Sequence, residues 1–171
     1  MKLENALWHY ALRLYRQDGV EQACLTLQAA GLSINRLLLC CWLGQEAGRK
    51  LALDQLEAAT TWQTDITHPM RALRYAVRPH KQQDDSYQAV YAAMRKAELA
   101  CEQVELALMC DAAETMEQAE TGVDLLLENL ACYLNACTLK QTIPTLDALE
   151  TVLRTVYPAL PENWKTGLPL H

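Results

Sequence analysis

The stretch Leu37–Leu43 reads Leu-Leu-Leu-Cys-Cys-Trp-Leu, seven apolar residues without interruption. A helix at a protein surface carries charged residues on its outer side, whereas a helix that is apolar all round is surrounded by other elements. Ser33 is a suitable N-terminal cap before this stretch, and Gly48 marks its end. We therefore predict a buried central helix at about residues 33–46.

The rest of the chain shows helical spacing of its apolar residues, with Gly or Pro at most boundaries. We predict an all-α fold, a single-domain irregular bundle of six or seven helices around the central helix. The segment 70–78 is either a separate helix or the continuation of a helix kinked at Pro69. The domain is expected to span 1–157, followed by an extended or loose Pro-rich C-terminal tail at 158–171. The other expected helices are 3–17, 20–30, 53–67, one long helix at 86–119, 123–137 and 145–157.

Composition narrows the class of protein. A chain with 51% hydrophobic and 21% charged residues can bury a core. The net charge of −6 argues against nucleic acid or an anionic membrane surface as a partner, since both select basic proteins. No apolar run approaches the roughly 20 residues of a membrane span, and the N-terminus does not resemble a signal peptide. We expect a cytoplasmic protein.

No motif in the sequence specifies a reaction. The seven cysteines contain no C-x-x-C pair, and the four histidines have no ligand spacing. A phosphate-binding glycine loop, a nucleophile elbow and a Glu-x-x-His metal motif are all missing from the sequence. We predict no metal, no cofactor and no catalytic residue, and we favour a protein that is not an enzyme.

Charge is distributed unevenly. Between residues 68 and 96 there are six basic and two acidic residues, whereas residues 97–139 contain nine acidic residues and no Lys or Arg. The arginines at 71, 74 and 78 could pair with Glu98, Glu102 and Glu105 on the next helix. An antiparallel hairpin turning near residue 82 would, however, place Arg74 opposite Val90. That register predicts that the arginines fall short of the glutamates by a turn or more.

Two functions remain open. The first is a protein-interaction or adaptor module that docks a protein partner, or a second copy of the chain, through its charged faces. Its partner face would contain Glu114, Glu117 and Glu120. The alternative is a small-molecule-binding protein or enzyme with a pocket between helices. The residues proposed for binding are Gln28, Asn35, Arg71, Arg74, Glu98 and Glu102, and those expected to line the pocket are Trp8, Tyr15, Gln28, Asn35, Trp42 and Arg74.

The N-terminal half contains a recognisable pattern. Its elements are Leu7-Trp8, Ala11-Leu12, Leu14-Tyr15, Gly19-Val20, Ala23-Cys24-Leu25-x-Leu27-Gln28, Gly31-Leu32, Asn35 and Leu37-Leu38-x-Cys40-x-Trp42-Leu43-Gly44. A second part is Pro69-x-Arg71-x-Leu73-Arg74 with Glu98 and Glu102. The pattern resembles that of a family of small, all-helical proteobacterial proteins of unknown function. The resemblance implies a helical fold and no particular activity.

Overall fold

The computed structural model describes residues 1–170. The all-α prediction is confirmed, and the described residues contain no strand, only one isolated bridge between Arg49 and Gln118. The helices, with their short π and 3₁₀ segments (η), are α1 (Ala6–Tyr15), α2 (Val20–Ala29), α3 (Ile34–Trp42), η1 (Leu43–Ala47), η2 (Leu53–Leu56), α4 (Glu57–Trp62), η3 (Gln63–Thr67), α5 (His68–Val77), η4 (Arg78–His80), α6 (Asp85–Ala113), α7 (Val123–Asn135) and α8 (Ile143–Val156).

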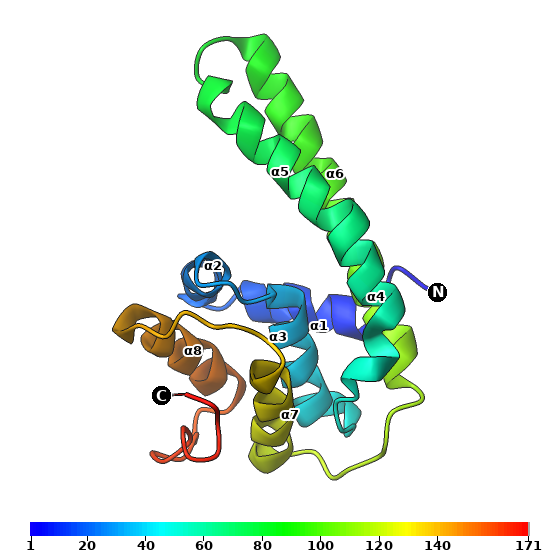
Figure 1. Ribbon diagram of the computed structural model, residues 1–171, viewed down its shortest axis with the longest axis vertical. Coiled ribbons are helices and arrows are strands. Elements are labelled where there is room, and N and C mark those ends of the chain that lie inside the picture. Colours follow the sequence, from blue (N-terminus) through cyan, green and yellow to red (C-terminus); the bar gives the residue numbers. More distant parts are fainter. Residues whose placement is uncertain (171) are drawn as a thin grey trace.

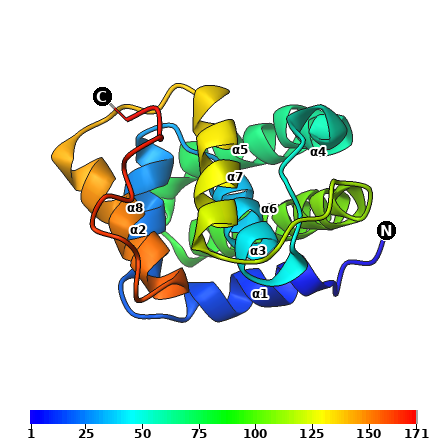
Figure 2. The ribbon, with the colours of Figure 1, turned by 90° about the horizontal axis from the view of Figure 1, so that it is seen from below.

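The apolar stretch forms the centre of the body, as predicted. No residue of Leu37–Leu43 is more than 8% exposed. Helices α1 and α7 and the body end of α6 pack around α3, while α2 and α8 lie side by side at one flank (Figure 2). The following turn η1 approaches α7 so closely that a Cβ on Gly44 would lie 2.6 Å from the Cα of Leu126. Glycine is therefore required at this crossing.

A two-helix arm projects from the body (Figure 1). One side is a continuous rod of α4, η3 and α5, and the other is the first half of α6. Pro69 has no backbone N–H, and the π-helical turn η3 immediately precedes α5. The segment predicted at 70–78 is thus the continuation of an existing helix. We call residues 68–97 the arm, and none of its side chains is buried.

The long helix is shorter than predicted. It ends at Ala113 and not near residue 119, because the chain then turns into an extended segment that pairs with the loop after η1. The Lys50 N–H donates to the Glu117 carbonyl, and the Ala119 N–H donates to the Gly48 carbonyl, both at 2.9 Å. These loop contacts satisfy backbone groups that a longer helix would have paired internally.

The C-terminal segment has turns but no regular helix, and it packs on the body. Leu160, Trp164 and Leu168 are buried in the same core as α8. Burial of these three apolar side chains holds the segment in place, where the proline content had suggested a loose chain. His171, the last residue of the tail, lies outside the described residues. Within residues 1–170, no helix has both the length and the apolar character that crossing a membrane requires.

Candidate functional site

A pocket of about 360 Å³ lies where the arm joins the body. We call it the arm-base pocket. Helices α1, α2, α3, α5 and α6 all contribute to its walls, together with η3 and the residue that caps α3. The lining residues are Trp8, Ala11, Leu12, Tyr15, Leu25, Gln28, Ser33, Ile34, Asn35, Leu38, Gln63, Arg71, Arg74, Arg95, Glu98, Leu99, Glu102 and Leu106.

One wall of the pocket is apolar and comes mainly from α1. Trp8, Leu12 and Tyr15 follow one another at helical spacing and face the pocket. The other side of α1 is fixed in the core by Leu7 and Leu14, which are buried. The helix therefore has two apolar faces, one that packs in the body and one that is left to line the pocket.

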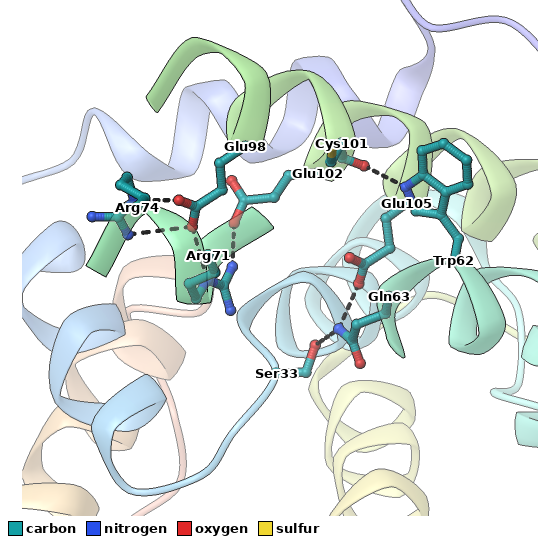
Figure 3. Close-up of polar contacts among 9 residues, drawn as sticks. All are labelled: Ser33, Trp62, Gln63, Arg71, Arg74, Glu98, Cys101, Glu102 and Glu105. Atoms are coloured by element: carbon teal, nitrogen blue, oxygen red, sulfur yellow. Dashed lines mark hydrogen bonds and ion pairs between the residues drawn. The ribbon is translucent and has the colours of Figure 1, made fainter. Parts of the chain in front are cut away.

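The opposite wall is an ion-pair network between α5 and α6 (Figure 3). Arg71 donates from Nε to Glu98 at 2.8 Å and from a terminal nitrogen to Glu102 at 2.5 Å. Arg74 also donates to both oxygens of Glu98 and to the Tyr91 hydroxyl. The arginine and glutamate side chains are each less than one-third exposed, so solvent screens these pairs only partly.

The prediction that the arginines fall short of the glutamates was therefore wrong. The predicted register itself placed Arg74 opposite Val90, and Arg74 does donate to the hydroxyl of the adjacent Tyr91. Helical side chains lean toward the N-terminus of their own helix, so the side chains of two antiparallel helices lean toward each other. The long arginine and glutamate side chains of α5 and α6 thereby meet although their backbones are offset.

The two glutamates of the network have opposite pKa shifts. Burial acts to raise the pKa of Glu98, but hydrogen bonds from Arg74 and Arg71 outweigh it and hold that pKa below its ordinary value. For Glu102, burial dominates and raises the pKa, although Arg71 opposes the rise. Glu98 is therefore the more readily ionised of the two glutamates.

A third glutamate lies behind the lining. Glu105 is 0% exposed, and its Oε1 accepts a hydrogen bond from the Gln63 amide at 2.7 Å. The same amide donates to the Ser33 hydroxyl at 2.8 Å (Figure 3). The Oε2 of Glu105 has no hydrogen-bond partner among residues 1–170. Burial raises the pKa of Glu105 to about 7, against the opposing effect of the Asn35 side chain.

Most of the residues proposed from the sequence meet at this pocket. All six residues proposed for binding line it, and so do Trp8 and Tyr15. Trp42 does not, since it is buried in the centre of the body. Glu114, Glu117 and Glu120 lie elsewhere and share no helical face, because α6 ends before them. Glu117 forms an ion pair with Lys50 at 2.8 Å.

Some residues of the site were missed. Arg95 and Leu99 lie at helical spacing with Glu98 and Glu102, a signal that could have placed them on the same side of the long helix. Glu105 was expected on the same helical face as Glu98 and Glu102, but its full burial was not, because that depends on Gln63 of another helix. Among residues 1–170, no three His, Cys, Asp or Glu side chains are arranged to hold a metal ion.

The geometry defines a class: an all-α protein with a pocket of mixed polar and apolar character between its body and a projecting two-helix arm. Residues 6–109 match a family described as proteins of unknown function, DUF2390, and the chain belongs to this family. No curated protein and no solved structure matches the chain. The whole lining of the arm-base pocket, from Trp8 to Leu106, lies within the matched residues.

Proposed function

We propose that the protein binds a small molecule in the arm-base pocket. The observation that carries this proposal is the convergence of seven polar residues from α2, α3, α5 and α6 on one hollow beside an apolar wall. A volume of about 360 Å³ lies within the range of small-molecule sites, which combine apolar walls with a few placed polar groups.

The two walls offer different contacts to a ligand. Trp8, Leu12 and Tyr15 would pack against an apolar part, and each 100 Å² of apolar area removed from water contributes about 2.5 kcal/mol. The side-chain amides of Gln28 and Asn35 both donate and accept hydrogen bonds, so they suit a neutral polar group. Because the arginines of the opposite wall are already paired, that wall is held in shape before a ligand arrives.

A neutral apolar dye tests the pocket. N-phenyl-1-naphthylamine fluoresces strongly when it leaves water, and its fluorescence should rise saturably with the wild-type protein. Leu99→Trp places bulk at the pocket, whereas Leu73→Trp places the same bulk on the arm away from it; the two leucines are 52% and 55% exposed. We expect about tenfold weaker dye binding for the first variant only. Equal effects of the two substitutions would contradict the proposal.

Self-association through the arm is a second candidate function. Ile66, Leu73 and Val90 are exposed apolar residues. They belong to one uncharged side of the two-helix hairpin, which consists of positions 66, 69, 73 and 76 of the rod and positions 90, 93, 97 and 100 of α6. Helical spacing places these positions on the side of the hairpin away from Arg71 and the pocket. Two identical surfaces without charge do not repel each other when they meet. This favours a second copy of the chain as the partner of this surface.

Sedimentation velocity tests this candidate. The wild type should form a dimer in the micromolar range, and Leu73→Glu should make it a monomer, because the glutamate would have to be buried without a partner. Gln88→Glu adds the same charge at an exposed position on the other side of α6 and should leave the dimer intact. A monomeric wild type, or equal effects of both variants, would count against self-association.

Docking of a different protein through the charged faces finds less support. The guanidinium groups of Arg71 and Arg74 are occupied by Glu98 and Glu102.

We infer a cytoplasmic location, which is supported by the seven cysteines, none of which forms a disulfide. We assign no reaction to the pocket.

A further inference from the structure

A second hollow of about 340 Å³ adjoins the arm-base pocket, and we call it the Arg36 hollow. The two share Gln28, Ser33, Gln63 and Arg71 in their walls. No acidic side chain lines the Arg36 hollow. Its lining residues are Gln28, Gly31, Leu32, Ser33, Arg36, Thr60, Gln63, His68, Arg71, Tyr133 and Cys137.

Arg36 has unused hydrogen-bonding capacity. One terminal nitrogen donates to the Thr60 hydroxyl at 2.6 Å, but the buried Nε has no partner. Among residues 1–170, the guanidinium also forms no ion pair with a carboxylate. A buried donor of a charged group without a partner is costly, so the Arg36 guanidinium gains free energy from a conformation in which it donates to a bound anion.

The surroundings of Arg36 are electropositive. His68 lines the same hollow, and burial together with the positive charges of Arg71 and Arg36 lowers its pKa. The carboxyl group that interacts with both arginines is Glu105, and burial raises its pKa to about 7, so it neutralises them only partly at neutral pH. Glu98 and Glu102 are already engaged by Arg71 and Arg74.

The start of α3 adds partial positive charge to the hollow. The Ser33 side chain does not cap the helix. Its backbone N–H donates to the Tyr133 hydroxyl at 2.7 Å, outside the first helical turn. The first N–H groups of a helix have no partner within it, and they favour an anion when one is near. The partial positive charge at the start of α3 therefore adds to the positive charge of the Arg36 side chain.

We propose that the Arg36 hollow binds an oxyanion group, a phosphate, sulfate or carboxylate carried by a small molecule, with Arg36 as its main ligand. His68 and the side-chain amides of Gln28 and Gln63 supply further donors. The proposal does not depend on a ligand in the arm-base pocket. If both sites are used together, the ligand is an amphiphile with its anionic group at Arg36 and its apolar part against α1.

Titration with inorganic phosphate at constant ionic strength tests the proposal. The Arg36 Nε–H signal in a ¹⁵N NMR spectrum of the wild type should shift saturably. Arg36→Gln should weaken phosphate binding about tenfold or more, as expected for the loss of a charge-assisted hydrogen bond. Arg78→Gln removes an exposed positive charge that lines neither hollow and should change binding less than twofold. The same titration with sulfate and with acetate shows which oxyanions the site accepts.

Two results would overturn the oxyanion site. One is an Arg36 Nε–H signal that stays unchanged up to about 10 mM phosphate, a measurement that needs no variant to fold. The other is equal weakening by Arg36→Gln and Arg78→Gln, which would indicate attraction by overall charge. Neither result affects the binding of neutral N-phenyl-1-naphthylamine at Trp8, so failure of this site and failure of the arm-base pocket are distinguishable.

Discussion

Arg71 joins Glu98 and Glu102, two carboxylates one helical turn apart, and thereby ties the arm to the part of α6 that enters the body. The Arg71 side chain is 19% exposed and that of Glu98 is 8% exposed. Removal of one partner from such a pair leaves an uncompensated charge in a poorly solvated place. The network therefore matters for stability as well as for the shape of the pocket wall.

Arg71→Met should lower the free energy of unfolding by about 3 kcal/mol, because Glu98 and Glu102 lose their shared cation. Urea denaturation at pH 7 measures this change. Arg95→Met removes an arginine of the same arm that forms no ion pair among residues 1–170, and its effect should stay within about 0.5 kcal/mol. Equal losses for the two variants would show that the network adds no stability.

Glu105 should make stability fall as pH rises. Its pKa in the folded protein is raised from 4.5 to about 7, so its contribution is fully present below pH 4.5 and is lost as pH rises through 7. Glu105→Gln removes this titration. Between pH 5 and 8 the melting temperature of the wild type should fall relative to that of the variant. Parallel pH profiles of the two proteins would contradict the raised pKa.

Gly44 should tolerate no side chain. A Cβ there would lie 2.6 Å from Leu126 backbone and side-chain atoms, so Gly44→Ala should cost about 2 kcal/mol of unfolding free energy by forcing η1 and α7 apart. Gly122→Ala is the matched control, because nothing lies within 4 Å of its Cβ and its backbone is extended. The prediction fails if urea denaturation gives the two variants the same stability.

The sequence was informative about the fold because burial leaves periodic patterns. Leu37–Leu43 indicated a central helix from its own composition, and the helix starts after Ser33 as expected, although the Ser33 side chain makes no capping hydrogen bond. The end of α6 was missed because it depends on backbone bonds between residues 117–119 and the loop after η1. Such a long-range pairing leaves no local signal at residue 113.

The site was predictable in part for the same reason. Gln28 and Asn35 stood out as polar residues beside an apolar region, and the structure places both in the lining of one pocket. The contact of Arg71 with Glu98 depended on how far the two long side chains reach along their helices, which helical spacing alone does not specify. Arg36 was overlooked because its unusual feature, a buried Nε without a partner, exists only in three dimensions.

The most direct test of the arm-base pocket uses the indole N–H signals of the four tryptophans. Trp8 lines the pocket, Trp62 donates its indole N–H to the Cys101 carbonyl at the foot of the arm, and Trp164 of the tail is buried against the body. A ¹⁵N NMR titration with N-phenyl-1-naphthylamine should shift the Trp8 signal saturably and leave Trp62 and Trp164 unchanged. A Trp8 signal that stays unmoved while the dye binds would contradict the proposed site.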